Sequence, residues 1–261
     1  MSRARLPTVA EVRAVVQPPG LLARNSGEHW AGRLYMRRVS PRLTRRLIGT
    51  PLTPNAVTWL MLLSGWLAAA ALSVPGLWTA AAAVLLIQLQ LLLDCSDGEL
   101  ARWRKVGSPA GIYLDRVAHF ATESALPIGL GIRADGGWDS IGGWTALGLL
   151  IAVLVLLKMA QGPLVAVARV ESGRPPLQDT ADTAAPRPTG VRRLRRAVGF
   201  LPFFRAFVAV EATLLAFAAA LADAAFGDLA GTRVLVIALI PIAAVTLAGR
   251  VAAIMLSGRL T

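Results

Sequence analysis

The sequence predicts an all-α membrane protein with six transmembrane helices, preceded by an N-terminal cytoplasmic amphipathic segment. Of the 261 residues, 55% are hydrophobic and only 16% are charged. The apolar residues come in blocks bounded by charge, Gly or Pro, and several blocks reach the roughly 20 residues needed to cross a bilayer core. These observations place the chain among integral membrane proteins.

The formal net charge of +12 would suggest a nucleic-acid partner in a soluble protein. In a membrane protein, basic residues mark cytoplasmic loops and contacts with anionic headgroups. No aromatic residues alternate with the arginines, so we expect membrane lipids and no nucleic acid as partners. The single cysteine, Cys95, excludes an intramolecular disulfide, and residues 1–20 lack the apolar core of a cleaved signal peptide.

Residues 1–49 are the predicted cytoplasmic N-terminal and juxtamembrane segment. Residues 1–32 are polar with scattered Pro and Gly, which predicts little order. Residues 33–49 mix Arg with Leu, Tyr, Met and Ile, a pattern typical of a basic amphipathic segment on a membrane surface. A positively charged flank without defined structure fits the same residues equally well.

Residues 50–261 form the predicted membrane domain. Its spans are expected at about 55–74, 78–102, 110–132, 142–169, 200–222 and 232–256. The first opens at Thr53-Pro54-Asn55, a helix start signal. Residues 171–198, which contain Pro, Asp, Thr and Arg, indicate a cytoplasmic loop.

Arg and Lys counts in the connections predict the orientation. These residues are frequent before the first span, between the second and third spans, and in the 171–198 loop. They are sparse at 73–77, 133–141 and 223–233. Both termini are therefore expected in the cytoplasm, which requires an even number of spans, and we expect the inner (cell) membrane of a bacterium.

Acidic residues and one histidine gather at the end of the second span and in the first half of the third: Asp94, Asp97, Glu99, Asp115, His119 and Glu123. Residues three or four apart share a helix face, so Asp94 and Asp97 share one face, and Asp115, His119 and Glu123 form a stripe on another. Because the second span ends where the third begins, we expect one pocket at the cytoplasmic face. Charge inside a span is expensive and usually functional.

Carboxylates crowded near hydrocarbon would repel one another and protonate. A divalent cation removes this conflict, and Mg²⁺ commonly bridges carboxylates to substrate phosphates. Phosphoryl transfer uses such ions to neutralise developing charge. The alternative interpretation is a helix-end ion-pair network with Arg102, Arg104 and Arg116.

Residues 94–115 read DCSDGELARWRKVGSPAGIYLD. This spacing resembles the signature of the CDP-alcohol phosphotransferase (CDP-alcohol phosphatidyltransferase) family, D-x2-D-G-x2-A-R-x8-G-x3-D-x3-D. The matching positions are Asp94, Asp97, Gly98, Ala101, Arg102, Gly111 and Asp115. The six-span layout and the Pro54-Asn55-x-x-Thr58 opening of the first span are also similar.

The resemblance implies a metal-dependent enzyme that moves the phosphoalcohol group of a CDP-alcohol to a hydroxyl acceptor and releases CMP, in phospholipid or lipid-linked headgroup synthesis. It also implies a homodimer. Asp94, Asp97 and Asp115 would hold Mg²⁺, or Mn²⁺, against the pyrophosphate. The residues that would bind CDP are Asn55, Thr58, Asp94, Gly98, Ala101, Arg102, Ser108 and Gly111. Glu123, Lys158 and Arg205 are candidates for acceptor binding.

One position departs from the signature, because His119 stands where the family has its last Asp, the proposed general base. An imidazole also serves as a general base near neutral pH. His119 is then the base beside a single metal, a ligand of a second metal, or part of a degenerate, slow site. We favour the first role, because the other seven positions are intact.

The signature recognises the shared CDP and leaves two substrate arrangements open. In one, CDP-diacylglycerol donates to a soluble alcohol; in the other, a soluble CDP-alcohol donates to a lipid hydroxyl. The rival from another class is a non-catalytic membrane protein that binds nucleotide or lipid on a degenerate site. A transporter is disfavoured, because the acidic residues gather at one membrane face rather than at the midplane.

Overall fold

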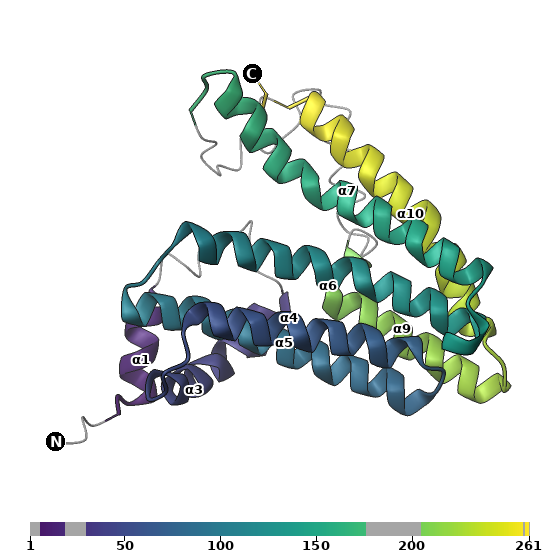
Figure 1. The fold of residues 1–261 in the computed structure, drawn as a ribbon, viewed down its shortest axis with the longest axis horizontal. Helices are drawn as coiled ribbons and strands as arrows, with labels where there is room; N and C mark the ends of the chain where they lie inside the picture. Colours follow the sequence, from purple (N-terminus) through teal and green to yellow (C-terminus); the bar gives the residue numbers. More distant parts are fainter. Residues whose placement is uncertain (1–5, 19–29, 176–204, 258, 261) are drawn as a thin grey trace. The chain divides into compact units, whose positions relative to one another are not determined.

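The computed structural model describes residues 6–18, 30–175, 205–257 and 259–260, and every regular element in these ranges is a helix (Figure 1). The chain divides into two compact units. The first unit comprises Met1–Ala68 and Leu85–Thr122, and the second comprises Ala69–Val84 and Glu123–Thr261. The acidic motif belongs to the first unit.

Two helices begin at a hydroxyl residue followed by proline. In α4 (Pro54–Ser73), the Thr53 hydroxyl accepts a hydrogen bond from the Ala56 N–H at 3.2 Å. In α6 (Pro109–Asp135), the Ser108 hydroxyl accepts from the Gly111 N–H at 3.1 Å. A capping oxygen satisfies an orphan donor of the first turn, and proline suits the first helical position. The predicted start of the first span is therefore confirmed.

The end of α5 (Leu77–Arg104) is a sharp stop that leads directly into α6. Lys105 adopts a left-handed conformation with φ of 55°, and the Val106 N–H bonds to the Ala101 carbonyl at 3.0 Å. This is the hydrogen-bond pattern of a Schellman C-cap. Because α6 begins four residues after Lys105, the last turns of α5 and the first turns of α6 lie at the same end of the first unit.

The N-terminal region contains a helix that the polar composition did not predict. α1 (Val9–Val16) opens with a capping box, in which Thr8 and Glu11 each bond the other's backbone N–H. Val12 and Val16 are fully buried. The expectation of little order is therefore wrong for these residues, because a short apolar face packs against the rest of the unit. Residues 1–5 and 19–29 lie outside the described part.

Residues 33–48 are helical, so the interpretation as a flank without defined structure is wrong. A π-helix, η1 (Gly32–Met36), runs into α3 (Arg37–Ile48), which lies beside α1 (Figure 1). Ser40, Thr44 and Leu47 of α3 are buried, whereas Arg38, Arg42 and Arg46, spaced four residues apart, are exposed. The helix is thus amphipathic, and its position on a membrane surface stays a prediction.

Among the described residues, five helices are long and apolar enough to cross a membrane: α4, α5, α7 (Gly143–Glu171), α9 (Ala209–Phe226) and α10 (Ala230–Met255). The predicted third span corresponds to α6, which has 27 residues but also carries charged side chains. Its crossing of the membrane stays a prediction. A short 3-10 turn, η2 (Trp138–Ser140), precedes α7.

The fifth predicted span begins later than expected. Arg205 to Val208 form a turn closed by a 2.9 Å bond from the Val208 N–H to the Arg205 carbonyl. Val208 is extended, with ψ of 136°, so α9 begins only at Ala209. The apolar composition before this point could not reveal the turn. Residues 176–204, which include most of the predicted 171–198 loop, lie outside the described part.

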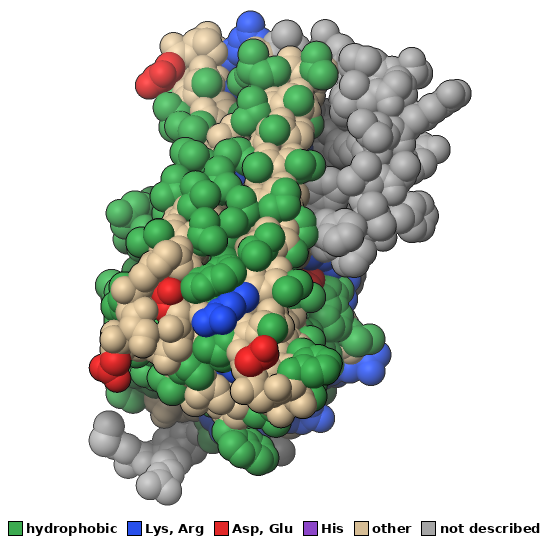
Figure 2. All heavy atoms as spheres, turned by 90° about the vertical axis from the view of Figure 1, so that its right-hand side faces the viewer, with side chains coloured by type: hydrophobic (Ala, Val, Ile, Leu, Met, Phe, Trp, Pro, Cys, Tyr) green, Lys and Arg blue, Asp and Glu red, His purple; other side chains and the backbone are tan. Residues whose placement is uncertain are grey.

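Apolar side chains face outward in the second unit, where α10 packs beside α7 and α9 (Figure 1). The face shown in Figure 2 is mostly hydrophobic, with few charged side chains among the described residues. Leu149, Val153 and Val170 of α7, and Val234 and Val245 of α10, are each more than 45% exposed. Such an apolar exterior suits contact with lipid, and the protein is an integral membrane protein.

Arg133 is buried in α6, whereas the predicted third span ends near residue 132 and leaves residue 133 in the 133–141 connection. Only 1% of this residue is exposed. Its Nη1 donates to the carbonyls of Val74 and Gly76, both at 3.0 Å, and its Nη2 lies 3.7 Å from Oδ2 of Asp223. The Asp223 carboxylate also accepts hydrogen bonds from the backbone and hydroxyl of Thr232. This network joins α6, α9, α10 and the α4–α5 turn within the second unit.

We expect Asp223→Ala to lower the free energy of unfolding by about 3–5 kcal/mol, because it leaves the buried Arg133 charge without its partner. Thermal unfolding of the purified protein in detergent measures this loss. The exposed Asp139 provides the matched control, since Asp139→Ala removes a carboxylate from the surface. Equal stability of the two variants would refute a supporting role for the network.

Candidate active site

The three acidic residues near the end of α5 have different surroundings. Glu99 is completely buried, Asp97 is 8% exposed, and the Asp94 side chain is 27% exposed. Glu99 accepts hydrogen bonds from Gln17, the C-cap of α1, and from Ser40 and Thr44 of α3. The sequence grouped the three by position alone, and the structure separates a buried anchor from the more accessible carboxylates.

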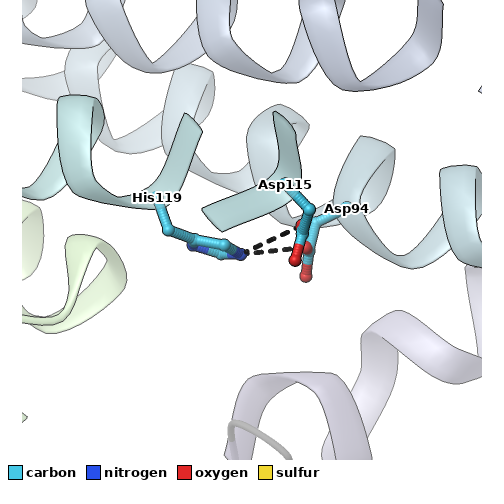
Figure 3. A group of neighbouring side chains, drawn as sticks. All are labelled: Asp94, Asp115 and His119. Carbon is cyan, nitrogen blue, oxygen red and sulfur yellow. Dashed lines mark hydrogen bonds and ion pairs between the residues drawn. The ribbon is translucent and has the colours of Figure 1, made fainter. Parts of the chain in front are cut away.

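Asp94, Asp115 and His119 converge on one point, with α5 supplying the first residue and α6 the other two (Figure 3). The Nε2 of His119 donates to Oδ1 of Asp94 at 3.1 Å and lies 3.6 Å from Oδ1 of Asp115. One ligand atom from each residue falls within 4.8 Å of the other two. The four-residue spacing of Asp115 and His119 places both on one face of α6.

This donor set fits a divalent cation. Two carboxylate oxygens and an imidazole nitrogen are the ligand types of Mg²⁺, Mn²⁺ and Zn²⁺ sites, and the nitrogen favours Mn²⁺ or Zn²⁺. The three side chains are 27%, 42% and 39% exposed for Asp94, Asp115 and His119. A substrate can therefore reach this cluster, whereas it cannot reach the buried Glu99.

Asp97 is held by α4. Thr58 donates its hydroxyl hydrogen to Oδ2 of Asp97 at 2.7 Å, and the Gly98 N–H bonds to the other carboxylate oxygen. These bonds satisfy a largely buried carboxylate and fix its orientation. Asp97 lies one turn along α5 from Asp94, but it is not part of the three-residue cluster.

Two glycines of the motif, Gly98 and Gly111, allow side chains of α4 and α5 to approach the backbone closely. A Cβ placed on Gly111 would lie 3.1 Å from Oδ1 of Asn55, and one placed on Gly98 would lie 3.2 Å from Nη1 of Arg102. The structure therefore brings Asn55 beside α6 and lays the Arg102 guanidinium over Gly98. Ser108, predicted to contact nucleotide, caps α6 here.

The three residues predicted for acceptor binding belong to the second unit. Lys158 Nζ lies 5.3 Å from the centroid of the Phe207 ring, a cation–π distance,. Glu123 and Phe207 both line an apolar cavity. Arg205, in the turn before α9, is exposed.

Sequence reasoning missed the part played by α1 and Glu99. The Glu99 carboxylate accepts hydrogen bonds from Gln17, Ser40 and Thr44. A local signal for α1 was present, because the capping box Thr8-x-x-Glu11 precedes apolar residues at helical spacing. The C-cap of α1, Gln17, bonds to Glu99, which lies 82 residues away in the chain. No local sequence pattern connects these two residues.

We expect Asp94→Asn and Asp115→Asn to weaken Mn²⁺ binding at least ~10-fold, since even the partners of metal ligands change affinity by about 10–100-fold. Electron paramagnetic resonance titration of free Mn²⁺ against the purified protein measures this directly. Asp139→Asn is the surface control. Undiminished binding in both variants would show that the cluster is not a cation site.

A comparison with known protein families supports the family resemblance of the acidic motif. A family model described as CDP-alcohol phosphatidyltransferase matches residues 51–216. No curated protein matches the chain. The matched range contains α4 to α7, the whole acidic motif and the start of α9, whereas α1 and α3 lie before it.

Proposed function

Because the chain belongs to the CDP-alcohol phosphatidyltransferase family, we propose that it transfers the phosphoalcohol group of a CDP-alcohol to a hydroxyl acceptor and releases CMP. The observation that carries this proposal is the convergence of Asp94, Asp115 and His119 within the matched range. Phospholipid or lipid-linked headgroup synthesis is the corresponding process. CDP-diacylglycerol and soluble CDP-alcohols are both candidate donors.

In this proposal, Asp94 and Asp115 hold a divalent cation. Asp97, whose orientation is set by Thr58, is the third ligand that the family resemblance implies, although it lies outside the cluster of Asp94, Asp115 and His119. Mg²⁺ is the expected ion, and Mn²⁺ is the alternative. When bound, the ion neutralises charge that develops on the phosphate oxygens. The partial exposure of Asp94 and Asp115 supports this assignment, because the diphosphate must reach the same carboxylates.

The CDP would lie along α5 and the start of α6. Gly98 and Ala101 let the nucleotide approach the α5 backbone, and Arg102 binds a phosphate through its planar fork. Gly111 leaves room beside Asn55. Asn55, Thr58 and Ser108 complete the proposed nucleotide set.

We assign His119 as the general base. The acceptor hydroxyl oxygen attacks the phosphorus that carries the alcohol, the bond from this phosphorus to the bridging oxygen of the diphosphate breaks, and CMP leaves with that oxygen. The hydroxyl proton passes to His119. Asp94 and Asp115 lie 3.1 and 3.6 Å from its Nε2, so they orient the ring and stabilise the imidazolium formed.

The proposed setting is the cytoplasmic face of a bacterial inner membrane, with six spans that include α6 and with both termini in the cytoplasm. The distribution of Arg and Lys in the sequence supports this orientation,. We also propose a homodimer, as the family resemblance implies. Glu123, Lys158 and Arg205 remain the candidates for acceptor binding.

A non-catalytic protein that binds nucleotide or lipid on a degenerate site is the second candidate. It is favoured by one observation, the presence of His119 where the family signature has Asp. The two candidates differ in whether CMP is released.

We expect His119→Ala to lower the rate of CMP release by about 10²–10⁴-fold, the usual contribution of a general base. His119→Asp restores the signature residue and should retain part of the activity. Because His119 contacts the proposed ligands Asp94 and Asp115, His119→Ala should also weaken Mn²⁺ binding, so CMP release is compared at saturating Mn²⁺, where the loss should persist. Full CMP release by His119→Ala would rule out the base, and CMP release restored by saturating Mn²⁺ would make His119 a part of the metal site instead.

A further inference from the structure

The N-terminal helix α1 is tied to the first unit at both of its ends. Before the helix, Nε of Arg45 donates to the Pro7 carbonyl at 2.6 Å. At its other end, Nε of Arg102 donates to the Val16 carbonyl at 2.8 Å. Arg102 is a residue of the signature in α5, so a segment outside the matched range 51–216 directly contacts the proposed nucleotide site.

Glu99 locks α1 in this position. Its buried carboxylate accepts from Nε2 of Gln17 at 2.7 Å, from the Ser40 hydroxyl at 2.6 Å and from the Thr44 hydroxyl at 2.7 Å. Nη1 of Arg37 lies 3.5 Å from the same carboxylate. A buried charge with several donors is costly to disturb, so Glu99 holds Gln17, and with it the end of α1, against α5.

The contact with Val16 determines how the Arg102 guanidinium lies. Its Nε is used on the Val16 carbonyl, while Nη1 and Nη2 lie 3.2 and 3.6 Å from the position of a Cβ on Gly98. The terminal amino groups therefore lie beside Gly98, another residue of the signature. An arginine fixed in its binding conformation does not have to be ordered when a ligand arrives, and this pre-organisation increases affinity.

We propose that α1 is a positioning element for Arg102, with Gln17 and Glu99 as its positioning residues, and that it increases affinity for the diphosphate of CDP. This inference rests on the proposed function, in which Arg102 binds a phosphate of CDP. It assigns a role to Gln17 and Val16, which precede the matched range.

The test is the dissociation constant of CDP, measured by calorimetry in the presence of Mg²⁺ with the purified full-length protein in detergent. Gln17→Ala and Gln17→Asn, which withdraw the amide from Glu99, should each weaken CDP binding about 3–10-fold. Arg13→Ala is the matched control, because Arg13 lies on the same helix and donates to the Arg38 carbonyl of α3. It should change the affinity less than twofold.

A double-mutant cycle separates positioning from general loss of structure. Combined with Arg102→Ala, the Gln17→Ala change should cause no further loss of CDP affinity, because its effect passes through Arg102. An equal loss in both backgrounds, or no loss in either Gln17 variant, would overturn the inference. If the unsubstituted protein binds no CDP, the proposed function fails and the inference falls with it; if that protein binds CDP but Gln17 has no effect, the inference alone fails.

Discussion

A carboxylate on an apolar helix is tolerated only where other groups satisfy it, and α5 carries three carboxylates within six residues. Transfer of an ionised carboxyl from water to a low-dielectric interior is among the most unfavourable events in folding. The first unit supplies a different partner for each: α1 and α3 provide donors to Glu99, Thr58 of α4 binds Asp97, and His119 of α6 binds Asp94. The elements of this unit are thus arranged around the acids of α5.

The partners also separate structural from chemical roles. Glu99 is fully buried and saturated with hydrogen bonds, so it suits an anchor. Asp94 and His119 are partly exposed and meet Asp115 at a shared point. A cation and a diphosphate need carboxylates that they can reach. The physical difference between these two groups is access, which residue type and spacing alone do not reveal.

Several features of the fold and the site were predictable from local sequence. Thr53-Pro54 and Ser108-Pro109 are helix starts in which the hydroxyl and the proline act within one turn,. The convergence of Asp94 with Asp115 and His119 followed from helical spacing and a short connection between two helices. The motif spacing also predicted the family, which the match to residues 51–216 shows.

Other features depend on contacts between distant residues and were not predictable. α1 has only eight residues, and a helix of this length is not stable alone. The burial of Val12 and Val16 and the bond from Gln17 to Glu99 therefore decide whether it forms. The predicted spans leave Arg133 in the 133–141 connection, and its burial depends on Asp223, which lies 90 positions further along the chain. The start of α9 at Ala209 depends on a turn that hydrophobicity does not record.

The central claim is that the partly exposed carboxylates Asp94 of α5 and Asp115 of α6 act in catalysis, and release of CMP tests it most directly. The purified protein would be incubated with pairs of CDP-alcohols and acceptors, including CDP-diacylglycerol with polar alcohols and soluble CDP-alcohols with lipid hydroxyls. Each pair would be assayed with Mg²⁺, with Mn²⁺ and with a chelator. At least one pair should release CMP only when an acceptor and a divalent cation are both present. Binding of CDP-alcohols without CMP release from any pair would contradict the claim and identify a binding protein.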